Sequence, residues 1–228
     1  MITGKVQKEK TEILLMEYAS GALDQASSLL IASYITLCPE ARHYYKQCEK
    51  LGGSLIENMC EPVAMQSDSL NAVLNRLDTH AKSTKTKHQQ APSKNMAFCK
   101  KQQLPQPLEL SIKNCQKKAR WRTVAPGIRY YPMQIEDCLH EAMLIRMAPR
   151  AKSIRHEHPG TELTLVLEGG YSDEYGHYKQ GDMVVIEEKM SHRPIADNTG
   201  CLALAVTSKP VRFTGTISSF LNIFIRTS

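Results

Sequence analysis

Three histidines and one glutamate in the second half of the chain have the spacing of a single metal site. They are His156, His158, Glu162 and His192. His156 and His158 are two positions apart, so in an extended chain both imidazoles project from the same face. Neutral imidazoles and a carboxylate suit a borderline divalent ion such as zinc, iron, manganese or nickel. These residues are therefore the candidate metal ligands.

The four candidate ligands can meet only if a folded sheet brings them together. Glu162 begins the apolar run L-T-L-V-L, and Pro159 and Gly160 mark a loop that can bring its carboxylate level with the imidazoles. His192 lies thirty residues beyond Glu162, after two more strand-like runs. We therefore expect His192 to arrive from a neighbouring strand.

From Trp121 onward, short apolar runs alternate with turn sequences such as P-G, G-G and N-T-G. Several short strands at this spacing are typical of an all-β sandwich or barrel. With Gly169 and the Gly181-Asp182 pair between the ligands, the pattern resembles the two motifs of the cupin superfamily. The resemblance implies an antiparallel β-barrel of the jelly-roll type over residues 121–228, with the metal inside it.

Composition and cysteine usage indicate a protein of a reducing compartment. The 228 residues are 42% hydrophobic and 23% charged. No apolar run approaches the roughly 18 residues of a membrane span, and the first residues lack the apolar core of a signal peptide. The seven cysteines are an odd number without a C-x-x-C pair, so we expect free thiols. These features predict a cytoplasmic protein without a membrane partner.

The chain ahead of the β region has the apolar spacing of a small helical bundle. We expect about four helices, over residues 11–19, 24–37, 39–52 and 67–77. Thr11 and Asp24 are candidate N-caps, and Pro39 suits a first helical turn. The last helix carries an apolar stripe, which is either buried in its own domain or packed on a partner. The stripe consists of Leu70, Val73, Leu74 and Leu77.

The excess positive charge lies in the middle of the chain. Residues 1–78 carry 7 basic and 10 acidic groups, residues 121–228 carry 12 of each, and residues 79–120 carry 10 basic groups against Glu109 alone. The apolar residues of 79–120 show no sustained period, so we expect a flexible basic linker. Its lysines could touch phosphates. A solvated spacer is the better interpretation, because the segment has little arginine or aromatic character.

The combination of a helical domain, a linker and a cupin resembles the ChrR family of anti-sigma factors. The similar segments are L-L-M-E-Y-A-S-G-A-L, S-Y-I-T-L-C-P-E-A, G-G-S-L-I-E, the last helix, W-R-T and E-L-T-L-V-L-E-G. The resemblance implies that residues 10–78 sequester an extracytoplasmic-function sigma factor. It also implies that the cupin ends this inhibition under oxidative stress.

The N-terminal part departs from that family in its zinc ligands. The family's helical domain takes them from an early His and a His-x-x-x-Cys-x-x-Cys run, and only one position here keeps a thiolate. The matching residues are Glu9, Tyr34, Cys38 and Ala41. A single Cys cannot hold zinc in a four-coordinate structural site, so we predict no N-terminal zinc. The cupin ligands are complete, and the resemblance implies one zinc ion there.

Two other functions remain open at this stage. The same three-histidine, one-glutamate set occurs in cupin dioxygenases and decarboxylases, where the metal keeps open positions. The sequence offers no separate general acid or base, so we expect a regulator and not an enzyme. A DNA-binding regulator ranks last, because residues 1–78 are net acidic and show no helix-turn-helix with a basic recognition helix.

Overall fold

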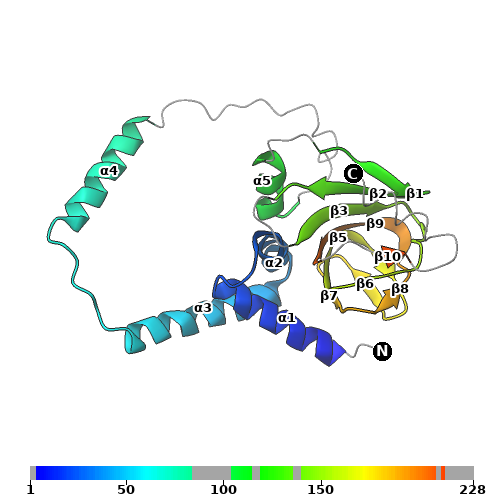
Figure 1. Cartoon of the computed structure of the whole chain (residues 1–228), viewed down its shortest axis with the longest axis horizontal. Helices are drawn as coiled ribbons and strands as arrows, with labels where there is room; N and C mark the ends of the chain where they lie inside the picture. The colour runs from blue at the N-terminus through cyan, green and yellow to red at the C-terminus, as the bar shows by residue number, and fades with distance from the viewer. Residues whose placement is uncertain (1–3, 84–103, 115–118, 136–139, 209–211, 214–228) are drawn as a thin grey trace. The chain divides into compact units, whose positions relative to one another are not determined.

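The computed structural model describes most of the chain as helices followed by strands (Figure 1). The described residues are 4–83, 104–114, 119–135, 140–208 and 212–213. Contacts divide the chain into two compact units. One unit consists of Met1–Gly52 with Leu104–Ser228, and the other of Gly53–Gln103. None of the described helices is long and apolar enough to cross a membrane.

The first two helices end where the sequence predicts, but the first begins earlier. Helix α1 spans Gly4–Ala19 and α2 spans Gln25–Leu37. Thr11 is not an N-cap: it lies inside α1, where its hydroxyl donates to the carbonyl oxygen of Gln7 at 2.9 Å. The Lys, Gln and Glu residues before it are good helix formers that show no apolar stripe. Asp24 caps α2 as predicted, accepting from the backbone N–H of Ala26 at 3.0 Å.

Part of the segment predicted as a linker is a packed helix. Helix α5, Gln106–Asn114, contacts α2, and the side chain of Leu108 is 0% exposed. Leu104 is buried beside the start of this helix. Two buried leucines are too few to produce a helical period in the sequence, so the prediction failed here. Of the rest of the expected linker, residues 79–83 belong to the helix Ser69–Ser83, and residues 84–103 and 115–118 lie outside the described residues.

The strands form two antiparallel sheets, in agreement with the predicted all-β domain. The larger has the order β1-β2-β3-β9-β5-β6 with β7 also paired to β5, and the smaller has the order β10-β4-β8. The larger sheet comprises β1 (Arg122–Ala125), β2 (Ile128–Met133), β3 (Glu141–Met147), β5 (Glu162–Ser172), β6 (His177–Lys179), β7 (Met183–Ile186) and β9 (Ile195–Thr207). The smaller comprises β4 (His156–Glu157), β8 (Ser191–His192) and β10 (Arg212–Phe213).

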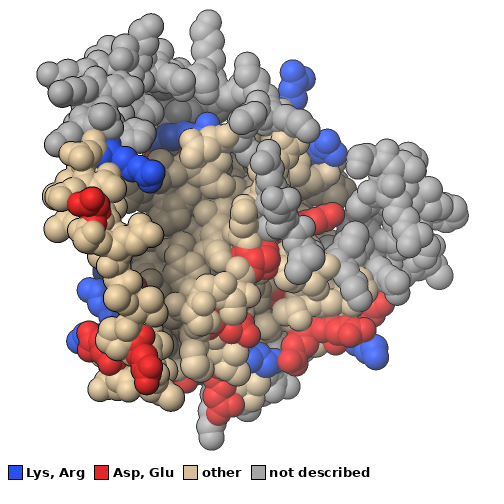
Figure 2. Space-filling model, turned by 60° about the vertical axis from the view of Figure 1, so that its left-hand side comes forward, with Lys and Arg blue, Asp and Glu red and all other residues tan. Residues whose placement is uncertain are grey.

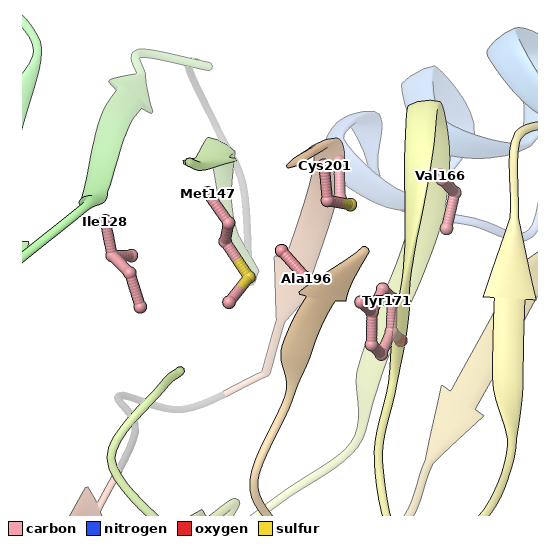
Figure 3. Packing of buried hydrophobic residues seen from close by; sticks show 7 residues of the cluster. Ile128, Met147, Val166, Tyr171, Ala196 and Cys201 are labelled. Atoms are coloured by element: carbon pink, nitrogen blue, oxygen red, sulfur yellow. The ribbon is translucent and has the colours of Figure 1, made fainter. Parts of the chain in front are cut away.

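The apolar core of the β domain includes a cluster of buried side chains from neighbouring strands of the larger sheet. Figure 3 shows Ile128 and Met147 beside Cys201 and Ala196, with Val166 and Tyr171 on β5. The run L-T-L-V-L in β5 is buried at every position, which requires cover on both of its faces. Helix α2 contacts β5 and β9, so the N-terminal helices supply part of this cover.

The glycines of the cupin-like motif occupy positions that other residues would not tolerate. Gly169 has a φ of +64°, and a Cβ there would lie 2.0 Å from the carbonyl oxygen of Gly200. Gly181 has a φ of +89° in the turn between β6 and β7. Both conformations favour glycine, and the first also allows β5 to approach β9 closely.

The second unit exposes its apolar residues. Helix α3 spans Pro39–Met59, beginning at Pro39 as predicted but continuing through Gly52, and α4 spans Ser69–Ser83. Among the described side chains of residues 53–77, none is buried. The exposed large apolar residues of this stretch are Leu55, Ile56, Met59, Val63, Met65, Leu70, Val73, Leu74 and Leu77. Figure 2 shows one face of the molecule, on which the Lys, Arg, Asp and Glu side chains are scattered between broad areas of other residues.

Replacement of Leu108 by alanine should destabilise the first unit. Removal of this buried side chain leaves a cavity between α5 and α2, which should cost about 2–5 kcal/mol in the free energy of unfolding. Leu110 is 49% exposed on the same helix, so Leu110→Ala is the matched control and should change stability by less than about 0.5 kcal/mol. Denaturant unfolding followed by circular dichroism measures both, and equal effects would contradict the packing of α5.

Candidate metal centre

Three short elements bring the four candidate ligands together. His156 in β4 lies opposite His192 in β8, and His158 is the first residue after β4. Glu162 is the first residue of β5. The prediction that His192 arrives from a neighbouring strand is therefore correct. One ligand atom from each of the four residues can be chosen so that all lie within 4.8 Å of one another.

The distance between two of the imidazole nitrogens suits a shared ion. Oε2 of Glu162 lies 2.5 Å from Nε2 of His158 and 4.0 Å from Nε2 of His192. The two Nε2 atoms of His158 and His192 are 3.2 Å apart. Two ligands of one tetrahedral zinc ion, each about 2.0–2.1 Å from it, would lie roughly 3.3 Å apart. Oε2 of Glu162 is buried, and no donor in the described part of the chain has the geometry of a hydrogen bond to it.

Burial and mutual charge keep the ligands in the forms that bind metals. Burial, followed by the charge of His192, lowers the pKa of His156 to about 4, so this imidazole is neutral at physiological pH. Burial alone would raise the pKa of Glu162, but the interaction with His158 and the charges of all three imidazoles lower it to about 2. A neutral His156 imidazole and an ionised Glu162 carboxylate are the protonation states in which these two groups bind a metal ion.

Hydrogen bonds fix the orientation of two of the three imidazoles. Nδ1 of His156 donates to the carbonyl oxygen of Ile154 at 2.8 Å. Nδ1 of His192 donates to Oδ2 of Asp173 at 3.0 Å, and the Asp173 side chain is 0% exposed. A proton held on Nδ1 leaves the Nε2 lone pair free, which is the usual role of the outer partners of a metal-binding histidine.

The turn that follows β5, residues 173–176, belongs to the site but was not predicted to be part of it. Besides the contact of Asp173 with the His192 ring, Glu174 accepts from the backbone N–H of Arg193 at 2.8 Å, and the Tyr175 hydroxyl donates to the carbonyl oxygen of Ser191 at 3.1 Å. The turn therefore binds the chain on both sides of His192. The D-x-x-G spacing of Asp173 and Gly176 is a turn signal that could have revealed it.

The four N-terminal positions that match the family's zinc ligands do not form a comparable cluster. Glu9 is exposed on α1 and Ala41 is buried at the start of α3. Tyr34 is hydrogen-bonded to Cys38, which raises the Tyr34 pKa in addition to the larger effect of burial. The Cys38 thiol also donates to Oε2 of Glu40 at 3.4 Å. Absence of zinc from this part stays a prediction.

The candidate partner residues and two further histidines, His140 and His177, lie outside the metal cluster. The stripe of Leu70, Val73, Leu74 and Leu77 is exposed on α4. His177 pairs with Asp197 at 2.9 Å on the surface, and His140 pairs with Asp24 at 2.6 Å. Cys201, a core residue, has its pKa raised to about 12 by burial and by the nearby Asp197 and Glu168.

Comparison with known proteins relates both halves of the chain to one family. A family model described as the ChrR cupin-like domain matches residues 113–211. The anti-sigma-E factor ChrR of Cereibacter sphaeroides is 30% identical over 224 residues, which cover 97% of this chain and 99% of that protein. The crystal structure of Rhodobacter sphaeroides SigE in complex with the anti-sigma ChrR matches with a TM-score of 0.67 at 30% identity. That match covers 86% of this chain and 96% of the other. Both the helical part and the cupin-like β domain are thus those of a regulator and not of an enzyme, and the chain belongs to the ChrR family of anti-sigma factors.

Proposed function

We propose that this protein sequesters an extracytoplasmic-function sigma factor in the cytoplasm through its helical region. The metal-bound cupin domain is needed to release the sigma factor in response to oxidative stress. In this proposal residues 10–78 bind the partner and residues 121–228 sense the signal. The connecting segment 79–120 includes the packed helix α5 and is therefore only partly a spacer.

The observation that carries sigma-factor binding is the exposed apolar surface of residues 53–77. Nine large apolar side chains of this stretch are exposed, from Leu55 to Leu77. Soluble proteins rarely leave so much apolar surface in contact with water unless a partner covers it. The stripe on α4 repeats at i, i+3, i+4 and i+7, the spacing by which a helix packs into a groove. A solved relative, ChrR, is in complex with a sigma factor, which identifies the class of partner.

Charge agrees with this partner. Residues 1–78 carry 10 acidic groups against 7 basic groups. A net acidic surface attracts the basic surface of a protein that otherwise contacts DNA, and it disfavours direct binding of this chain to nucleic acid. Charge therefore supports a sigma factor over DNA as the ligand of the helical region.

For the cupin domain we propose one zinc ion held by His156, His158, Glu162 and His192. Three imidazoles and one buried carboxylate form a compact donor set that suits zinc. Zinc is redox-inert, and when bound it would supply a fixed positive charge that neutralises the buried Glu162 carboxylate. Iron, manganese or nickel in the same donor set would be expected of a dioxygenase, which is the alternative function.

Introduction of a charge into the α4 stripe should weaken sigma-factor binding. Leu74→Lys places an ammonium group where an apolar contact is expected, so the Kd should rise at least about tenfold. Ala72→Lys adds the same charge on the opposite side of α4 and should leave the Kd within about twofold. Titration of the full-length protein with an extracytoplasmic-function sigma factor of the same organism measures both. Equal Kd values for the two variants would exclude the stripe from the interface.

The metal content should be one equivalent per chain and should depend on His156. His156→Ala removes a ligand of the only proposed site, so the purified variant should hold little metal. His177→Ala alters a surface histidine paired with Asp197 and should keep the full equivalent. Elemental analysis after dialysis gives the metal identity and amount. A residual equivalent in His156→Ala would contradict a zinc-free N-terminal domain, and iron in the wild type would favour the dioxygenase.

Loss of Asp173 should weaken metal binding without removing a ligand. Asp173→Ala frees the His192 ring to rotate, and the loss of such an outer hydrogen bond typically lowers metal affinity about 10–100-fold. Asp182→Ala is the matched control, because Asp182 also accepts a turn hydrogen bond, from Lys179, but touches no ligand. Competition with a chelating dye measures the zinc Kd. Wild-type affinity in Asp173→Ala would show that the turn does not position His192.

A further inference from the structure

Helix α1 lies beside β7 of the β domain (Figure 1). One of its side chains pairs with the backbone of β7 as a neighbouring strand would. The carboxamide of Gln7 donates to the carbonyl oxygen of Val185 at 2.9 Å and accepts from the N–H of the same residue at 3.0 Å. Val185 lies in β7, which among the described strands pairs only with β5. Gln7 therefore satisfies both backbone groups on the outer edge of β7, which would otherwise stay open to solvent or to another chain.

A second polar contact lies one helical turn along α1. Nζ of Lys10 pairs with Oε1 of Glu187 at 2.8 Å, two residues beyond Val185. Gln7 and Lys10 are three positions apart, so both side chains leave the same face of α1. Together they hold residues 185–187 of the β domain against the helix.

The segment held by α1 leads directly to the metal ligands. Because the backbone groups of Val185 point to Gln7, those of Ile186 point the other way, towards β5, where Ile186 lies opposite Glu162. Further on, the N–H of Lys189 donates to the carbonyl oxygen of His158 at 3.1 Å. The same run of chain then reaches His192. Residues 185–192 thus contact α1 at one end. Over the rest of its length the segment pairs with Glu162, bonds to His158 and contains His192.

This connecting segment also contains a strained residue. Lys189 has a φ of +67°, in the left-handed region that a side chain with a Cβ rarely occupies. Such a conformation is strained and persists only where surrounding contacts hold it. The hydrogen bond to His158 is one of these contacts. The segment therefore has a reason to change conformation when the ligands are no longer held in place.

We propose that residues 185–192 couple metal binding in the cupin to the docking of α1, so that loss of the metal loosens the hold on Gln7 and Lys10. This inference rests on the proposed zinc site. It describes how a change at that site would reach the N-terminal helices. The ion fixes Glu162, His158 and His192, and these fix the segment whose outer edge binds α1. Because coupling between two sites is reciprocal, loss of the α1 contact must also weaken metal binding.

The coupling can be measured on the full-length protein without a sigma factor. Amide hydrogen exchange of α1 should be at least about fivefold faster after the zinc is removed with a chelator. In Gln7→Ala the same α1 amides should exchange quickly with or without zinc, and the zinc Kd should rise by a similar factor. Lys8→Ala is the matched control, because Lys8 pairs with Glu12 on α1 and its side chain is 77% exposed. It should behave like the wild type in both measurements.

The outcomes separate this inference from the proposed function. The coupling would be overturned, and the metal site left intact, by two results together. Gln7→Ala would bind zinc with wild-type affinity, and the exchange rate of the α1 amides in the wild type would not change when zinc is removed. A wild-type protein that binds no zinc would overturn both. Faster exchange throughout the protein on zinc removal, with no difference between Gln7→Ala and Lys8→Ala, would indicate general destabilisation and would also refute the coupling.

Discussion

The arrangement of the β domain depends on the interactions that compensate the buried carboxylate of Glu162. A carboxylate removed from water is costly unless charges or hydrogen bonds compensate it. Here Thr164 donates to Oε1 at 2.7 Å, and three imidazoles surround the carboxylate as a whole. Two of those imidazoles come from β4 and β8, so the small sheet must lie against the start of β5. A divalent ion at this point would neutralise the carboxylate, and it would also explain why four polar groups meet in the interior.

The positions of the histidines depend in turn on contacts with residues that are not themselves candidate ligands. The turn of residues 173–176 binds the ring of His192 and the backbone on both sides of it. Arg155, next to His156, forms an ion pair with Glu174 of the same turn. One short turn thus holds both histidine-bearing strands. The geometry of the candidate metal site therefore depends on the whole end of the β domain, including residues outside the set of candidate ligands.

The two compact units differ in a way that suits a regulator. The unit with the β domain buries its apolar residues, including Leu30 and Ile31 of α2 and Leu108 of α5. The unit of residues 53–103 has no buried side chain among those described from 53 to 77. A region that lacks a core of its own gains stability from a partner, because binding adds to the free energy of the folded form. Within the first unit, the contacts of α1 with β7 connect the β domain physically to the N-terminal helices.

Some features of this protein could be predicted from local sequence alone. The alternation of short apolar runs and turns predicted the antiparallel domain, Asp24 predicted a helix start, and the spacing of His156, His158 and Glu162 predicted their proximity. The beginning of α1 and the packing of α5 could not be predicted in this way. In α1 the first turns bind the β domain through polar groups, Gln7 and Lys10, which carry no apolar period. In α5 the burial rests on a single fully buried leucine.

Local sequence thus specifies a set of chemical groups: the candidate ligands, the glycines that permit close strand contacts and the apolar stripe on α4. Their types and intervals along the chain follow from periodicities of two and of about 3.6 residues, which are local properties. The contact of Asp173 with His192 and the pairing of Gln7 with Val185, 178 positions away in the chain, arise only in the folded molecule. Contacts of that separation depend on how the sheets curve and where the helices settle, and no local pattern records them.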